Sequence, residues 1–109
     1  MPETQVDEHD RLYREFGWLV PTRFNISIAC ATRWARDPRR VAIRVDRGDA
    51  PAETLTYARL DADANRLANA LEANGVRPGD RVALLLPQCT ETAIAQMAIL
   101  RMGAVAMPL

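Results

Sequence analysis

Lysine is absent from this 109-residue sequence, and all 14 of its basic residues are arginines. Without lysine, the chain has no amine that could form a Schiff base, act as a general base or complete a lysine-bearing phosphate loop. Arginine serves a solvated surface almost as well as lysine does, so the absence by itself says nothing about the fold. It excludes several catalytic chemistries.

Histidine and cysteine are scarce as well, with one histidine and two cysteines. His9 stands in an acidic N-terminal stretch, and an isolated ring offers little for a metal cluster or a catalytic triad. Cys30 falls on the apolar side of a predicted helix and is expected to be a small core residue. Cys89 is expected at a helix N-terminus, where the dipole favours thiolate, but no histidine is near it in sequence. We therefore predict no disulfide framework, no metal site and no catalytic residue.

Net charge and long apolar runs are also missing. The 14 acidic residues balance the arginines, so no overall field attracts nucleic acid or an anionic membrane. Six arginines cluster between residues 33 and 47, but Asp37, Asp46 and Asp49 are interleaved with them, which is typical of a solvated face. Charged residues interrupt every apolar run before the roughly 18 residues that a membrane span needs. The acidic N-terminus differs from a secretory signal, so we expect a cytoplasmic protein.

The first third of the chain predicts two helices. A short helix is predicted over residues 10–16, and the apolar run over residues 18–21 should pack on something rather than stay in solvent. Asn25 is a good N-cap for a second helix. Apolar residues continue at helical spacing until Asp37-Pro38 ends the segment.

A change of period then indicates a hairpin. Residues 41–45 alternate in the manner of a half-buried strand, and residues 54–56 are expected to return as its antiparallel partner. Residues 46–51, which lie between them, have turn chemistry, with a glycine and a proline. We expect this hairpin at the margin of a sheet.

The next helix is predicted over residues 57–74, with Thr56 as its cap and Gly75 as the left-handed residue that ends it. Residues 77–80 match a type II turn, with proline second and glycine third. The polar face of the helix is predicted to carry Asp61, Asp63, Arg66 and Glu72. The apolar stripe is Leu60, Ala64, Leu67, Ala68 and Leu71.

The last 30 residues predict a strand, a helix and a second strand. Residues 81–86 are continuously apolar after Arg81, as in a parallel strand covered on both faces, and Pro87 ends the run. Residues 92–100 are mostly apolar and helical, Gly103 suits the helix end, and residues 104–109 are extended again. The fold class is therefore α/β: N-terminal helices, a β-hairpin and a β-α-β parallel unit, an incomplete subdomain of a larger layered α/β domain.

An ordered set of short motifs in this sequence resembles the AMP-forming acyl-CoA synthetases and other adenylate-forming ligases. Two upstream motifs, Phe24-Asn25-Ile26 and Arg33-Trp34-Ala35, are similar to the short- and medium-chain acyl-CoA synthetases. Further motifs are the segments 55–60, 65–71, 75–76, 78–83 and 86–88, Glu91 and the segment 103–109. Arg59 departs from the glutamate common in the family, which would complete a capping box with Thr56. The resemblance implies an N-terminal extension, partly helical, over residues 1–17, and the truncated start of the large AMP-binding (adenylation) domain over residues 18–109.

The same resemblance implies a two-step ligase that activates a carboxylic (fatty) acid with ATP to acyl-AMP and passes the acyl group to coenzyme A. In the family the phosphates are held by a Ser/Thr/Gly-rich loop ending in Pro-Lys, and a catalytic lysine lies in a mobile C-terminal domain. Neither is present in this chain. We therefore expect it to bind no cofactor alone, whereas ATP, Mg²⁺ and coenzyme A would belong to the intact enzyme. Gln88 follows the end of a predicted parallel strand, where open α/β sheets place ligands, and is the candidate for bordering the crevice.

Three hypotheses follow from these observations. The chain is part of an acyl-CoA synthetase, an acid–thiol ligase. Alternatively, it is part of a peptide-synthetase adenylation domain that loads a carrier protein. The third hypothesis is a small non-catalytic α/β module for binding or regulation, for example a dimer that covers its open sheet edge. We expect no nucleic-acid partner and no membrane span under any of them, and the residues that select the acyl substrate in the family lie beyond Leu109.

Overall fold

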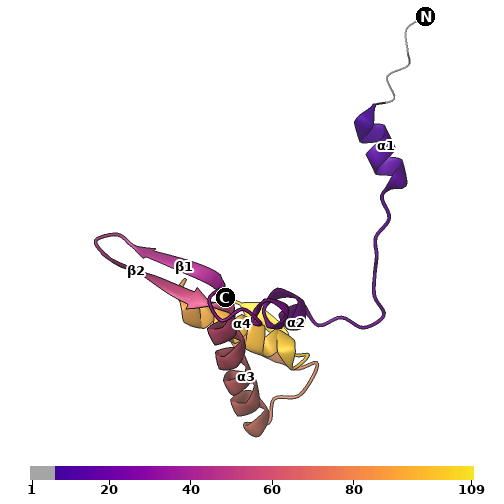
Figure 1. Ribbon diagram of the computed structural model, residues 1–109. Coiled ribbons are helices and arrows are strands. Elements are labelled where there is room, and N and C mark those ends of the chain that lie inside the picture. Colours follow the sequence, from indigo (N-terminus) through magenta and orange to yellow (C-terminus); the bar gives the residue numbers. More distant parts are fainter. Residues whose placement is uncertain (1–6) are drawn as a thin grey trace, which may run out of the picture.

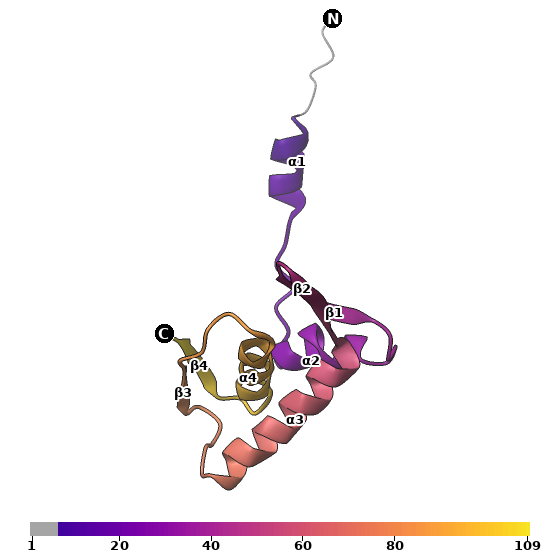
Figure 2. The same ribbon diagram turned by 90° about the vertical axis from the view of Figure 1, so that its left-hand side faces the viewer.

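The computed structural model describes residues 7–109, which form an N-terminal arm and a body (Figure 1). The arm contains helix α1 (Glu8–Glu15), capped by Asp7, and an extended segment that leads to the body at Asn25. Figure 2 shows α1 standing well apart from all other elements. Trp18, Leu19 and Val20 are 81–97% exposed, so this apolar run does not pack on the other described residues, and its expected packing on something stays a prediction.

The second predicted helix is shorter than expected and is broken. Helix α2 (Ile26–Cys30) begins where Asn25 accepts a hydrogen bond from the Ile28 backbone N–H at 3.2 Å, so the predicted cap is confirmed. Ala31 leaves helical geometry, and a 3₁₀ turn, η1 (Thr32–Trp34), follows. Ser27 and Ala31 are the buried side chains of this region. Cys30 is exposed, and its expected place in the core is wrong, because the buried face of α2 is one that carries a polar serine.

The predicted hairpin is present. Strands β1 (Val41–Arg47) and β2 (Ala50–Thr56) pair antiparallel around the two-residue loop Gly48-Asp49, and together they form a sheet of two strands. Gly48 has a φ of 68°, which suits a primed hairpin turn. The hairpin reaches away from the helices as a flat extension (Figure 1).

Helix α3 (Tyr57–Ala73) is the longest element, and its predicted cap and stripe are confirmed. The Thr56 hydroxyl accepts a hydrogen bond from the Arg59 backbone N–H at 3.2 Å. Leu60, Ala64 and Ala68 are buried. At the C-terminal end, Gly75 adopts a φ of 93°, and the Val76 N–H donates back to the Leu71 carbonyl at 3.0 Å, which closes the helix.

The β-α-β unit is confirmed. Strand β3 (Arg81–Leu84) leads to helix α4 (Thr90–Arg101) and then to β4 (Val105–Pro108), which pairs parallel with β3 from Arg81↔Val105 to Leu84↔Pro108. Gly79 sits in the predicted type II turn with a φ of 88° and donates its N–H to the Gly103 carbonyl at 2.9 Å.

Strand β3 ends two residues earlier than predicted. Leu85 is 80% exposed, and Leu86, Val105 and Met107 are also exposed. The sheet is covered on one face only by α4, whose Ala95 and Ile99 form a core cluster with Leu84 and Ala104. A second cluster of alanines, Ala64, Ala68 and Ala98, lets α3 and α4 approach closely. The chain is thus an α/β unit whose parallel sheet has an open apolar face.

Candidate functional site

The loop between β3 and α4 carries the residue predicted to border a ligand crevice. Gln88 is exposed there, in the loop that follows the carboxyl end of β3 at Leu84. With Cys89, Thr90 and residues 43–46 of β1, it lines a hollow of about 550 Å³ between the hairpin and the N-terminus of α4. The fold therefore places the Gln88-Cys89 loop beside strand β1, which carries Arg44.

The groups around Cys89 form a local hydrogen-bonded turn. Cys89 is the N-cap of α4 but makes no side-chain cap hydrogen bond, and its Sγ lies 3.4 Å from Thr92 Oγ1. The Thr92 hydroxyl in turn donates to the Pro87 carbonyl at 2.7 Å. His9 lies on the exposed helix α1, so it is not brought to Cys89. No imidazole base is therefore available to Cys89 among the described residues.

Glu91 is the titratable group of this region whose pKa is perturbed. Hydrogen bonding by its own backbone N–H, and then by the side chains of Cys89 and Thr90, lowers the pKa of Glu91 below its ordinary value of 4.5. These donors lie in the first turn of α4, where free N–H groups favour an anion. The carboxylate therefore stabilises the helix end.

Across residues 7–109 no three His, Cys, Asp or Glu side chains are grouped so as to hold a metal ion.

A partly buried polar cluster joins α2, η1, α3 and α4, and sequence reasoning missed it. Arg101, at the end of α4, donates from Nη2 to Asp61 Oδ1 at 2.5 Å and to Thr32 Oγ1 at 2.7 Å. Its Nη1 donates to Asn65 Oδ1 at 2.6 Å and to the Asp61 carbonyl at 3.2 Å, and its Nε donates to Ser27 Oγ at 3.2 Å. We call these five residues the Arg101 cluster.

The Arg101 cluster uses all five guanidinium N–H donors, which lysine could not match. The side chains of Arg101 and Asp61 are only 14% and 18% exposed. Asp61 was predicted on the polar face of α3, opposite the apolar stripe, and there a partner 40 residues away removes it from solvent. The sequence signal for this cluster was Arg101 itself, a charged residue that follows the mostly apolar residues 93–100 of α4. The cluster is structural, since neither Arg101 nor Asp61 lines the hollow beside Gln88.

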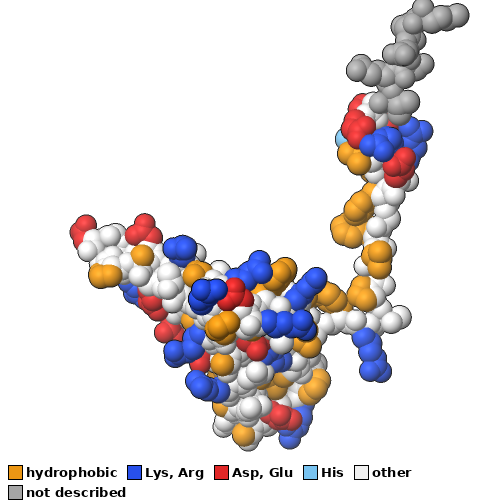
Figure 3. All heavy atoms as spheres, viewed as in Figure 1, with side chains coloured by type: hydrophobic (Ala, Val, Ile, Leu, Met, Phe, Trp, Pro, Cys, Tyr) orange, Lys and Arg blue, Asp and Glu red, His pale blue; other side chains and the backbone are white. Residues whose placement is uncertain are grey.

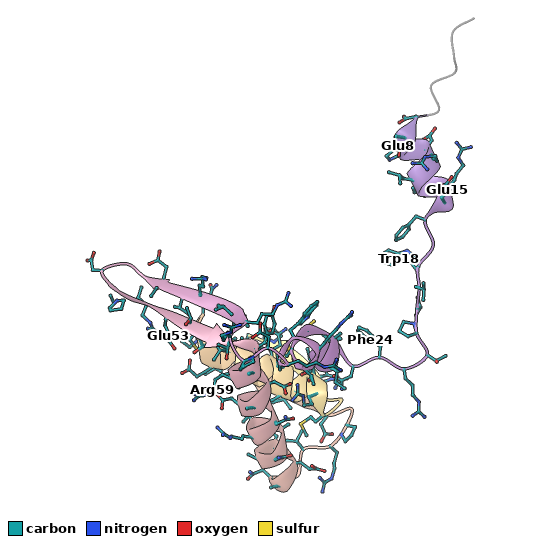
Figure 4. All side chains as sticks on the ribbon, viewed as in Figure 1. Glu8, Glu15, Trp18, Phe24, Glu53 and Arg59 are labelled. Atoms are coloured by element: carbon teal, nitrogen blue, oxygen red, sulfur yellow. The ribbon has the colours of Figure 1, made fainter. Side chains whose placement is uncertain are left out.

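The predicted arginine cluster surrounds Trp34. The guanidinium carbons of Arg40 and Arg33 lie 4.3 and 5.3 Å from the Trp34 ring centroid, so the ring is held by two cation–π contacts. Arg47 pairs with Glu53 on the hairpin at 2.6 Å. Figure 4 shows Glu53 on the hairpin and Arg59 at the start of α3, both directed outward. The expected solvated face is confirmed for these exposed arginines.

Comparison with known proteins identifies the family. Residues 30–109 match the family model described as AMP-binding enzyme. This chain belongs to the AMP-binding enzyme family. Within the family it is 38% identical over 105 residues to the acetyl-coenzyme A synthetase of Leptospira biflexa, which is 94% of this chain and 16% of that protein. It is 43% identical over 95 residues to the salicyl-AMP ligase / salicyl-S-ArCP synthetase of Mycobacterium tuberculosis, covering 85% of this chain and 16% of that protein.

A solved family member shares the fold. The chain superposes on the Brucella canis acyl-CoA synthetase with a TM-score of 0.82 and 29% sequence identity, over 95% of this chain and 21% of that one. The chain therefore spans about one-sixth of the curated relatives it matches. The predicted family resemblance is confirmed. No helix among residues 7–109 is long and apolar enough to cross a membrane.

Proposed function

We propose that this chain is the N-terminal part of the adenylation domain of an AMP-forming acyl-CoA synthetase. The whole enzyme would activate a carboxylic acid with ATP and Mg²⁺ to an acyl adenylate and then transfer the acyl group to coenzyme A. The observation that carries this proposal is the family match over residues 30–109, joined to relatives that are named acetyl-coenzyme A synthetase. Residues 1–17 would be an extension, and residues 18–109 would open the domain.

Within that enzyme the chain would supply scaffold rather than reacting groups. Charge that builds up on transferring phosphates needs cations and clustered backbone amides. The sequence has no lysine, and its positive-φ glycines lie at four separate turns and helix ends. The chain alone should therefore be inactive. Gln88 would border the crevice of the whole enzyme, because it follows the carboxyl end of the parallel strand β3.

The acyl acceptor distinguishes a second candidate. The similarity to a relative named both AMP ligase and S-ArCP synthetase supports an adenylation domain that loads a carrier protein in place of coenzyme A. Both candidates share the first half-reaction, so they differ only in the thiol that receives the acyl group.

ATP–pyrophosphate exchange with a panel of carboxylic acids tests the shared half-reaction. The panel should hold acetate, longer fatty acids and an aromatic acid, and it should be run on this chain and on the polypeptide encoded when the reading frame is extended past Leu109. We expect exchange only in the longer protein, with Gln88→Ala raising KM there and the exposed control Asn69→Ala leaving it unchanged. Product analysis with coenzyme A or a carrier protein then separates the two candidates. Exchange by the 109-residue chain, or by neither protein, would contradict the proposal.

A further inference from the structure

Thr92, in the first turn of α4, holds the loop that carries Gln88. Its hydroxyl donates a hydrogen bond to the Pro87 carbonyl at 2.7 Å, and its backbone N–H donates to the Cys89 carbonyl at 3.2 Å. The two carbonyls belong to the residues directly before and after Gln88 in the sequence. One residue of the helix therefore brackets Gln88 from both sides, through contacts that involve no residue outside the segment 87–92.

The hydrogen bond to Pro87 fixes the plane of a peptide unit. The Pro87 carbonyl belongs to the unit that joins Pro87 to Gln88, and this unit is trans. Because a trans peptide unit is planar, anchoring its carbonyl oxygen also sets the direction of the Gln88 N–H, which points the opposite way. The proline ring restricts the backbone on the other side of the unit. The direction in which Gln88 leaves the loop therefore depends on the Thr92 hydroxyl.

The hollow beside Gln88 carries charges of both signs. Arg44 and Asp46 of strand β1 line it, and Figure 3 shows acidic and basic side chains interspersed over the hairpin to which they belong. The other polar residues that line the hollow are uncharged: Gln88, Cys89, Thr90, Thr92 and Gln96. Since neither sign is in excess, a ligand here would be selected by the direction of hydrogen bonds rather than by net charge. The placement of the Gln88 amide then matters more than the local field.

We propose that Thr92 is a positioning residue for the adenylation reaction, which holds the Gln88 amide where it meets a substrate in the crevice, an inference that rests on the proposed function. Thr92 acts through Gln88 and not on the reacting atoms. Threonine suits this role because a β-branched side chain is stiff at χ1, so its hydroxyl stays directed at the Pro87 carbonyl. Loss of the hydroxyl should therefore weaken substrate binding only while the Gln88 side chain is present.

Kinetics of the polypeptide extended past Leu109 test the link between Thr92 and Gln88. Thr92→Val removes the hydroxyl and keeps the branched shape. In ATP–pyrophosphate exchange it should raise the same KM that Gln88→Ala raises, by about three- to tenfold for one lost hydrogen bond, with little change in kcat. Thr92→Ser keeps the hydroxyl and should restore the KM to within about twofold of the wild type. In the Gln88→Ala background, Thr92→Val should have no further effect on KM. The control Thr22→Val, at an exposed position of the arm, should have no effect either.

NMR relaxation of the 109-residue chain tests the effect of the hydroxyl on the loop without any reaction. The backbone N–H of Gln88 should have an order parameter near the roughly 0.85 of ordered backbone in the wild type and in Thr92→Ser, and should fall toward about 0.6 in Thr92→Val.

An equally ordered Gln88 in Thr92→Val overturns the inference, and so does a loosened loop with an unchanged KM. A rise in KM that persists in the Gln88→Ala background also overturns it, because Thr92 would then act by itself. Absence of exchange from every extended protein contradicts the proposed function and with it the substrate at Gln88, whereas the order parameters still decide whether Thr92 holds the loop.

Discussion

Removal of the Arg101 guanidinium should destabilise the chain far more than removal of any surface arginine. In the folded chain this group donates to Ser27, Thr32, Asp61 and Asn65, and the Arg101 carbonyl accepts a hydrogen bond from Asn25 Nδ2 at 2.9 Å. Replacement by alanine leaves the Asp61 carboxylate, 18% exposed, without its cation. An unpaired charge in such a place is costly because water replaces only part of the lost interaction.

The expected loss of stability depends on how far the Arg101–Asp61 pair is buried and on which hydrogen bonds Asp61 keeps when Arg101 is removed. Breaking a fully buried ion pair by removing one partner costs about 3–5 kcal/mol. Solvent reaches part of this pair, and the Thr32 hydroxyl still donates to Asp61 Oδ1 at 2.6 Å, so we expect about 2–4 kcal/mol for Arg101→Ala. Arg101→Lys keeps the charge but loses the planar fork, and should cost about 1–2 kcal/mol.

Urea unfolding followed by circular dichroism measures these free energies. The matched control is Arg66→Ala, whose Nη1 bonds Asp63 at 3.0 Å but whose side chain is 76% exposed, and which should cost no more than about 0.5 kcal/mol. A double-mutant cycle with Asp61→Asn should show a coupling of about 1–3 kcal/mol. If Arg101→Ala fell within error of Arg66→Ala, or if Arg101→Lys matched the wild type, the account of the Arg101 cluster as a structural lock would be wrong.

Two further predictions concern helix α4. Ala98 is fully buried against Ala64 and Ala68, so Ala98→Leu should overpack the α3–α4 contact and destabilise the chain by about 1–3 kcal/mol. The control Ala70→Leu, at an exposed position of α3, should change the stability by less than about 0.5 kcal/mol. Equal urea midpoints for the two variants would refute close packing between the helices. Because the pKa of Glu91 is lowered on folding, its ionised form stabilises the chain above the ordinary value of 4.5, and this contribution is lost as pH falls through the lowered folded value. Glu91→Gln should therefore melt earlier than the wild type near pH 7, and the difference should shrink as the pH falls below 4.5; a difference that stays constant on acidification would contradict the assignment.

Sequence patterns predicted the helices, strands and turns that depend on residues close to one another in the chain. The stripe of α3 follows from apolar side chains at helical spacing, and its ends follow from a threonine that caps and a glycine that adopts positive φ. The same reasoning located the type II turn at Gly79 and the parallel order of β3 and β4. The position of Gln88 after a strand end could also be predicted, since it depends only on the order of elements.

Other features depend on residues far apart in the chain, and the patterns could not reveal them. Asp61 looks like a surface residue until Arg101 is folded beside it, and Cys30 looks like a core residue until Ala31 breaks the helix and Ser27 takes the buried side. Apolar periodicity reports which side chains avoid water, but it does not report which polar groups find partners.

The sequence by itself determined the α/β order, the helix and turn boundaries that caps and glycines set, and the family to which the chain belongs. The tertiary structure alone decided where the polar lock lies and which apolar surfaces stay uncovered. A hydrogen-bonded ion pair needs three-dimensional placement within about 3 Å, and so no one-dimensional pattern specifies it. The open sheet face and the projecting arm were likewise visible only once the chain was folded, because exposure is a property of what else occupies the space.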